Sequence, residues 1–418
     1  MADTEFLTEY PASWATGSNQ LGVKEYNERL VMDVVRRAGA ASKADITRIT
    51  QLSAQTITVI ANRLIAEGYL KKGEAVKGKV GQPSVPLSLD PEGATSVGIK
   101  LGRRTVDISM MSFDYQILAH RSLEYDYPEV DVVFDWLNLN LAEMIEALPD
   151  VSQSRIRGMG VAVPSHLDAW EGVIRAPMGV LQKWQGIDVA SIIQSQFPYP
   201  VYQINDATAA CLAELSLHHR RQRLSCMYFF IGTFFGGGIV LDGQLYLGHT
   251  GQAGAVASLP LSLPTIQTVL PPQMVTAAGL HSLESKAREK GLKRRLFLTE
   301  TELSDDEQAL FDSWAQDAAQ ALAFAIIGGQ SFLDVPTVII DGRLPDQLVT
   351  RITDYVRDAF ARFDLQGIQL PEIRQGRLGA RARSSGAAIV PLHQQFAIQT
   401  SQLMKVNEQN KNPIKQGV

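Results

Sequence analysis

Two apolar runs joined by a glycine-rich turn constrain the fold of this chain more than any other stretch. Residues 228–231 are apolar, Gly232 begins the turn, and three glycines at 236–238 precede a second apolar run that ends at Leu241. Short apolar runs bounded by turn residues predict paired strands. Glycines there allow a ligand to approach the backbone closely. Either a ligand-binding hairpin or a hairpin without a ligand fits this pattern.

A second stretch precedes this hairpin and carries polar side chains. The short apolar strand predicted at 201–204 runs into Asn205 and Asp206, and a helix of small residues begins at once. A carboxylate at a strand end suits a general base or an acceptor for ligand hydroxyl groups. The alternative is that Asp206 only caps the helix that follows it.

Composition limits the class of protein. The 418 residues are enough for two or three domains, and no run of about eighteen apolar residues predicts a membrane span. The N-terminus does not resemble a signal peptide. Two scattered cysteines, Cys211 and Cys226, fit a reducing compartment, so we expect a cytoplasmic protein. The spacing of ligand-type residues predicts no metal site, and we expect no cofactor.

The charge is unevenly placed along the chain. Residues 24–82 carry eleven Lys and Arg against six Asp and Glu, although the whole chain has a net charge of −5. The remainder is therefore strongly acidic. A basic segment on an acidic body predicts that this segment alone contacts nucleic acid.

Three helices are predicted in the basic segment. Apolar residues recur at helical spacing over 24–38, Ser42 starts a second helix with Ile46 and Ile49 on its buried face, and Ser53 starts a third. Two short helices joined by a tight turn are typical of a helix-turn-helix, and the lysines that follow predict a basic wing. The alternative is a three-helix packing module that binds no DNA. The residues expected to contact DNA are Ser53, Gln55, Thr56, Thr58, Arg63, Lys77, Lys79 and Gln82.

These stretches resemble the ROK family of repressors and sugar kinases. Its Asn-Asp-Ala-Asn-Ala-Ala motif is similar to 205–210, and its phosphate loop, Gly-Thr-Gly-x-Gly-Gly-Gly-Ile, is similar to 232–239. The resemblance runs from about Leu30 almost to the C-terminus. It implies an α/β fold in which a winged helix-turn-helix precedes a two-lobed, actin-like body built of ribonuclease H-like lobes.

The chain departs from the family's kinase pattern at the first strand of the body. Kinases of the family read Gly-x-Asp-x-Gly-Gly-Thr there, whereas this chain has Lys100 at the Asp position and Arg103-Arg104 in the turn. A cation cannot ligate magnesium, and two long side chains would occupy the triphosphate pocket. We therefore expect no enzyme activity and no catalytic residue. The three cations could instead hold the phosphate of a sugar phosphate, or Lys100 could pair with a core carboxylate.

The loop after the hairpin departs from the family in a second way. Ala255 and Ser258 stand where the family has a sugar-binding Glu and a His, and its Cys-x-Cys-Gly zinc motif is absent. Other polar groups must then contact a ligand. A lone histidine such as His249 is more often structural or exposed than a ligand contact. The residues expected to contact the effector are Ser165, Asn205, Asp206, His249, Gln252 and Gly254.

The expected domains follow this order along the chain. They are an arm at 1–23, the winged helix-turn-helix at 24–83, a linker at 84–94, the body at 95–400 and a polar tail at 401–418. The resemblance implies a repressor of carbohydrate uptake or catabolism genes, with double-stranded operator DNA and a carbohydrate effector as partners. A homodimer or a dimer of dimers is expected because half-sites are read with two-fold symmetry. The alternatives are a sugar kinase with a DNA-binding segment, and a regulator controlled by a protein partner.

Overall fold

The structure, a computed structural model, describes residues 20–75, 84–169, 171–218, 224–264, 270–293, 296–299 and 302–398. These divide into two compact units. We call 20–94 with 392–398 the small unit and 95–391 the large unit. The expected arm, the polar tail and the predicted DNA contacts Lys77, Lys79 and Gln82 lie outside the described residues.

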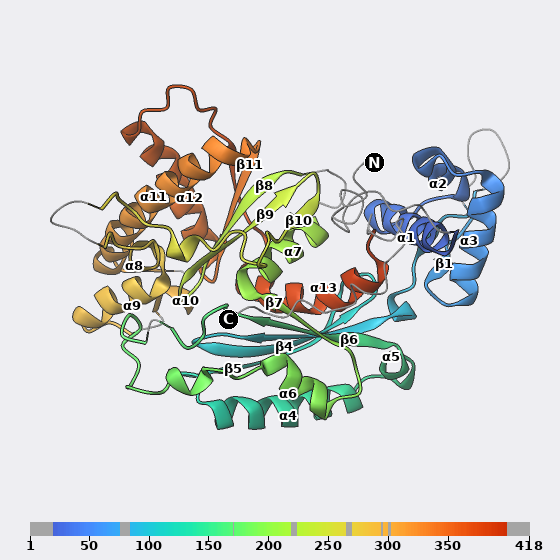
Figure 1. Cartoon of the computed structure of the whole chain (residues 1–418), viewed down its shortest axis with the longest axis horizontal. Helices are drawn as coiled ribbons and strands as arrows, with labels where there is room; N and C mark the ends of the chain where they lie inside the picture. The colour runs from blue at the N-terminus through green and yellow to red at the C-terminus, as the bar shows by residue number, and fades with distance from the viewer. Residues whose placement is uncertain are drawn as a thin grey trace, which may run out of the picture. The chain divides into compact units, whose positions relative to one another are not determined.

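Three helices and a two-stranded sheet build the small unit (Figure 1). The elements are α1 (Gln20–Ala38), α2 (Lys43–Thr50), α3 (Ala54–Ala66), β1 (Leu70–Lys72) and β2 (Leu87–Leu89). β1 and β2 pair antiparallel, with Leu70 opposite Leu89. β2 lies inside the segment 84–94 that was expected to be a linker. It forms a strand there because Leu87 and Leu89 are buried in the core of the small unit.

Local sequence explains the ends of the short helices. Ser42 and Asp45 form a complete capping box at the start of α2, and Gln51 ends it in the left-handed conformation at φ 59°. The Ser53 hydroxyl accepts from the backbone N–H of Thr56 and caps α3. The prediction that Ile49 is buried is wrong, since it is 51% exposed. Ile46 is the buried side chain of this two-turn helix.

Two five-stranded sheets of the same design form the large unit (Figure 1). In each, three antiparallel strands from successive hairpins are extended by two parallel strands. The first sheet has the order β5 (Ile117–Glu124), β4 (Thr105–Ser112), β3 (Thr95–Leu101), β6 (Ile156–Val163), β7 (Val201–Asn205). The second has the order β10 (Gln244–Tyr246), β9 (Phe235–Leu241), β8 (Cys226–Ile231), β11 (Thr337–Gly342), β12 (Glu372–Gln375). The predicted hairpin of the glycine-rich turn is confirmed as β8 and β9.

Helices cover these sheets and connect their parallel strands. The helices of the first half are α4 (Val130–Glu146), α5 (Asp150–Ser154), α6 (Val189–Gln196) and α7 (Asp206–His218). Those of the second half are α8 (Val275–Ala278), α9 (Leu280–Glu289), α10 (Leu296–Thr299), α11 (Asp305–Leu333), α12 (Asp346–Ala359) and α13 (Ala382–Phe396). α4 packs its apolar face on the first sheet through Val133, Leu137 and Leu141. No helix within the described ranges is both long enough and apolar enough to cross a membrane.

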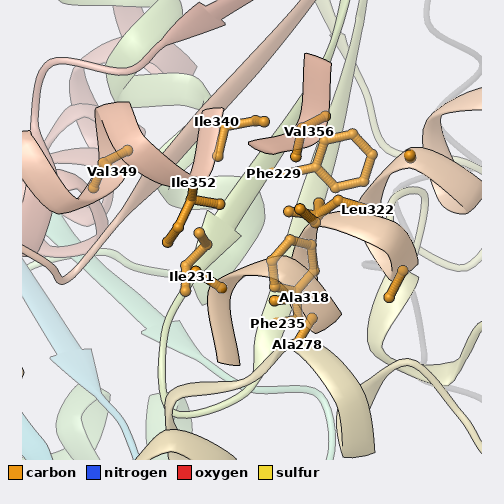
Figure 2. Close-up of a cluster of buried hydrophobic side chains, with 14 of the residues drawn as sticks. Phe229, Ile231, Phe235, Ala278, Ala318, Leu322, Ile340, Val349, Ile352 and Val356 are labelled. Atoms are coloured by element: carbon orange, nitrogen blue, oxygen red, sulfur yellow. The ribbon is translucent and has the colours of Figure 1, made fainter. Parts of the chain in front are cut away.

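The larger core lies between the second sheet and helices α11 and α12. α11 begins with a complete capping box, Ser304 and Glu307, and with acidic residues that favour a helix N-terminus. Figure 2 shows Phe229 and Ile340 of this sheet against Ala318 and Leu322 of α11 and side chains of α12. Alanines on the buried face of α11 let the helix approach the sheet closely.

Glycines allow the closing helix α13 to pack closely against the rest of the large unit. A Cβ on Gly160 of β6 would lie 1.9 Å from the Ala387 oxygen, and one on Gly386 would lie 1.8 Å from the Ala209 oxygen of α7. Neither position can accept a side chain without a backbone shift. This packing fixes the beginning of α13, which carries Arg383, next to the start of α7.

The end of α13 belongs to the small unit. The boundary between the two units falls between Pro391 and Leu392, so the body does not extend to residue 400 as expected. Phe396 meets the Tyr69 ring edge-to-face with centroids 5.2 Å apart, and Arg29 of α1 donates to the Ala397 carbonyl. His393 is partly buried here, and its desolvation lowers its pKa to about 4. These contacts explain why 392–398 cluster with the N-terminal helices.

Candidate functional site

A pocket of the large unit gathers the ends of three strands of the first sheet and the turn between β8 and β9. β3, β6 and β7 run parallel, so the segments after them, which begin at Gly102, Pro164 and Asp206, meet at one edge. Its polar lining residues are Lys100, Arg103, Arg104, Thr105, Ser165, His166, Asn205, Asp206, Thr233, Gln252, Ser258, Arg343 and Arg383. Five basic side chains and one carboxylate therefore line this space.

Asn205 is the cap of helix α7. Its Oδ1 accepts from the backbone N–H groups of Ala207 and Thr208 at 3.0 and 3.3 Å, and its Nδ2 donates to the Ser165 hydroxyl at 3.0 Å. Asp206 adds a single backbone contact, to Ala207 N–H. Capping is thus mainly the work of Asn205, and it leaves one Asp206 oxygen for another partner.

That partner is Arg383 of α13. Its guanidinium donates to Asp206 Oδ2 at 3.1 Å and lies over the Phe230 ring at 4.8 Å. The Arg383 Nε is buried and has no hydrogen-bond partner among the described residues. The sequence analysis missed Arg383. The signal in the sequence was a charged residue, Arg383, among the small residues that begin the closing helix.

Lys100 is buried and satisfied by neighbouring strand residues. Its ammonium donates to the Thr105 carbonyl at 3.0 Å and lies 3.3 Å from Asp107 Oδ2 of β4. Burial, together with the charges of Arg383 and Arg343, lowers the pKa of Lys100 to about 7 against the attraction of Asp107. The alternative that Lys100 pairs with a core carboxylate is therefore the one observed.

Arg103 and Arg104 both turn towards the second half of the large unit. The Arg103 guanidinium stacks 4.2 Å from the centroid of Phe234 in the β8–β9 turn, and burial lowers its pKa to about 10. Arg104 pairs with Glu284 of α9 at 3.4 Å, and both side chains are buried. The two arginines of the turn after β3 thus link the two sheet-containing halves.

Phe234 is a second residue that the sequence analysis missed. It occupies a position at which the phosphate-loop motif quoted above has glycine. Its ring lies under Arg103 and meets His281 of α9 edge-to-face at 5.2 Å. The departure from the glycine pattern was the signal, and its consequence is that aromatic and cationic side chains fill part of this turn.

The structure brings together all but one of the residues expected to contact an effector. Ser165, Asn205, Asp206, Gln252 and Gly254 line the pocket. Gly254 has a φ of +87°, and a Cβ there would lie 2.7 Å from Gly237 of β9. His249 is exposed and is not part of the lining, so the structure contradicts its placement there. The reason is the turn between Gly248 and Gly251, both at positive φ, which leaves residue 249 at its exposed tip.

The described residues expected to contact DNA fall into three groups at α3. Gln55 and Thr58 are exposed at its N-terminal end. Ser53 caps the helix, and its hydroxyl also bonds to the Thr56 hydroxyl. Arg63 pairs with Glu28 of α1 and with Glu67, both at 2.7 Å, so its guanidinium ties α3 to α1.

Named relatives include a xylose repressor and a DNA-binding transcriptional regulator. The chain is 24% identical over 274 residues to a xylose repressor of Caldicellulosiruptor bescii, an alignment that covers 66% of each protein. It is 22% identical over 251 residues to the DNA-binding transcriptional dual regulator NagC of Escherichia coli K12, covering 58% of this chain and 60% of NagC. The alignments therefore span just under two thirds of these relatives' own length.

Solved structures share the fold. A ROK family transcriptional regulator described as a homologue of the Escherichia coli MLC protein aligns with a TM-score of 0.65 at 18% identity, covering 92% of this chain and 99% of that one. The ROK hexokinase of Thermus thermophilus aligns with a TM-score of 0.50 at 25% identity, covering 71% of this chain and 97% of that one. The large unit has the sugar-kinase-like fold of both.

The family model agrees with this fold over most of the chain. The model of the ROK family matches residues 96–392, which begin in β3 and end in α13 and so include every strand of both five-stranded sheets. The match also contains the whole lining of the pocket. The chain therefore belongs to the ROK family.

Proposed function

We propose that the protein is a DNA-binding transcriptional repressor of sugar-metabolism genes, and that its large unit senses a small molecule without phosphorylating it. The observation that carries the proposal is a three-helix unit whose α3 has a capped, exposed N-terminal end, joined to a ROK body with a ligand-sized pocket. Relatives named xylose repressor support the same role.

The small unit acts as a winged helix-turn-helix in this proposal. α2 and α3 are joined by the tight turn at Gln51, and β1 and β2 form the base of a wing. Gln55 can bond to an adenine edge, and Thr58 can bond to several bases. Val59, which is 64% exposed on the same helix, suits contact with a thymine methyl group.

Phosphoryl transfer is disfavoured by the residues at the kinase positions. Lys100 is bonded to Thr105 and Asp107 at the position where the family's kinases have an Asp for metal. Phe234, Arg103 and Arg104 fill the turns that would cradle phosphates. Transfer depends on a positioned metal ion and on turns that cradle the triphosphate of ATP, and the residues at these positions suit neither.

A sugar kinase remains the rival because Asp206 and the glycine-rich β9 are retained. A coupled assay with ATP, magnesium and a panel of sugars separates the two functions. We expect no sugar phosphate to form. Formation of a sugar phosphate that disappears in Asp206→Asn would establish the kinase instead.

The repressor function is tested by selecting duplexes from a random DNA library with the full chain. We expect enrichment of a two-fold symmetric sequence, bound with steep salt dependence, because a homodimer would present two α3 helices to two half-sites. Gln55→Ala should relax preference at one base pair, at a cost of about 1–3 kcal/mol. Gln366→Ala, at an exposed position of the large unit, is the matched control. Failure to enrich any sequence would refute the proposed repressor function.

A further inference from the structure

We propose that the pocket selects a ligand carrying a phosphate group, so that the effector is a phosphorylated polyol rather than a neutral sugar. The inference rests on the proposal that this pocket senses a small molecule. Its basis is the chemistry of the lining, in which Arg103, Arg104, Arg343, Arg383 and Lys100 face the same space as a single carboxylate, Asp206.

Arg383 pairs with Asp206 inside the pocket, whereas three of the other cations pair with carboxylates outside its lining. Arg104 pairs with Glu284, Arg343 with Glu124, and Lys100 with Asp107, and none of these three acids lines the pocket. Such pairs reduce the free-energy cost of burying the cations, and they fix the orientation of each cationic side chain. The side facing the pocket therefore keeps a positive character, which favours an anion.

Two arginines are also oriented as phosphate-binding groups. Arg103 stacks on Phe234 and Arg383 stacks on Phe230, at 4.2 and 4.8 Å from the ring centroids. A stacked guanidinium keeps its plane fixed, so its N–H groups are preorganised for a phosphate or carboxylate. Arg103 also donates to the His166 carbonyl and Arg383 to Asp206, and these contacts fix the two guanidinium groups further.

The cations disturb one another in the absence of an anion. Burial lowers the pKa of Lys100 and of Arg343, and charge repulsion by Arg383 is the next largest cause for both. For Arg103 the attraction of Asp206 and Asp168 exceeds this repulsion. A bound phosphate would offset this repulsion. The same lining supplies Asn205 and the Ser165 hydroxyl, which suit the hydroxyl groups of the polyol part.

The test compares three probes on the full chain by calorimetric titration: a hexose, its 6-phosphate and inorganic phosphate. We expect the phosphate ester to bind at least about tenfold more tightly than the hexose, since charge-assisted hydrogen bonds are stronger than neutral ones. Binding of inorganic phosphate as tight as that of the ester would assign the selectivity to free phosphate and refute the polyol part. Equal affinity for the hexose and the ester would refute the proposal that the pocket selects a phosphate group.

Arg103→Gln should abolish the preference for the ester. Arg121→Gln, which removes a partly exposed arginine paired with Glu143 outside the pocket, should preserve it. If circular dichroism shows that Arg103→Gln does not fold, Arg103→Lys takes its place. Lysine keeps the positive charge but lacks the paired N–H donors of a guanidinium, so the preference for the ester should fall in part. Full preference in the folded Arg103 variant contradicts the assignment.

DNA binding measured on the same preparation separates the two proposals. A protein that selects DNA but prefers the neutral hexose refutes the phosphate inference alone. A protein that prefers the ester but selects no DNA refutes the repressor and leaves the phosphate pocket in place.

Discussion

Arg383 and Asp206 form a 3.1 Å ion pair between the first turn of α13 and the start of α7, with side chains only 10% and 15% exposed. In a kinase of this family the corresponding carboxylate would serve a sugar hydroxyl, as the resemblance implies. Here its Oδ2 is already bonded to a guanidinium. A ligand that bonds to Asp206 must share or displace this contact, so occupancy of the pocket is coupled to the position of α13.

Replacement of Asp206 by Asn should remove the ligand response while leaving α7 intact. The cap is retained because Asn205 accepts from two backbone N–H groups of the first turn. Loss of the charged hydrogen bond to Arg383 should cost about 1–3 kcal/mol of unfolding free energy. The check is denaturant unfolding together with DNA binding in the presence and absence of the hexose 6-phosphate.

Asp206→Ala serves as the companion variant. If Asp206 were only a cap, Asp206→Asn would respond to ligand as the parent does, and Asp206→Ala would merely be less stable. We expect both variants to fold, bind DNA and stay unresponsive. A normal response of Asp206→Asn would remove the argument for placing the ligand beside this carboxylate.

How far the sequence predicts this site depends on the range of each interaction. Asn205 and Asp206 could be predicted from local sequence, because they are the two residues at which a strand ends and a helix begins. Arg383 meets Asp206 across 177 positions of sequence, so that pair follows only from the packing of α13. The glycine-rich hairpin was predictable because turn and strand patterns are short-range. β2 was missed because its two buried leucines are separated by one residue, too short a pattern to count as a strand.

Arg63 should affect the small unit differently from Gln55. Its two ion pairs join α3 to Glu28 of α1 and to Glu67, whereas Gln55 is exposed at the other end of the helix. Arg63→Ala should therefore lower the melting temperature without changing the relative affinities for different DNA sequences. Competition binding with a panel of mutated half-sites measures this. A change of base preference in Arg63→Ala would show that the residue reads DNA after all.

Gly386→Ala should be strongly destabilising. The added Cβ would lie 1.8 Å from the Ala209 oxygen, and both backbones are held by helices, so α13 must shift. Overpacking of this kind costs about 1–3 kcal/mol or more. Gly328→Ala in α11 is the matched control, because a Cβ there meets nothing within 4 Å. The control should be neutral or stabilise the protein by up to about 1 kcal/mol, as helix propensity predicts. Thermal unfolding of the two variants side by side decides whether close approach at Gly386 matters.

Lys100 should make stability rise with pH above neutrality. Its pKa is about 7 in the folded protein, because of burial and of Arg383 and Arg343, against an ordinary value of 10.5. Between these two values the unfolded chain binds more protons than the folded one, so unfolding becomes less favourable as pH increases through this window. The groups that face Lys100 are Thr105, Asp107 and Asp206 in addition to the two arginines.

The measurement is the free energy of unfolding in urea at pH 6.5, 8 and 9.5 for the parent and for Lys100→Met. The parent should gain stability relative to the variant as the pH rises, since the penalty for burying a charged ammonium disappears when Lys100 loses its proton. Lys286→Met, which removes a lysine that is 37% exposed, should run parallel to the parent. If Lys100→Met unfolds, direct titration of the lysine ammonium by NMR in the parent replaces it. A difference between parent and Lys100→Met that stays constant over this range, or a titration near 10.5, would mean that Lys100 keeps its charge in the folded protein.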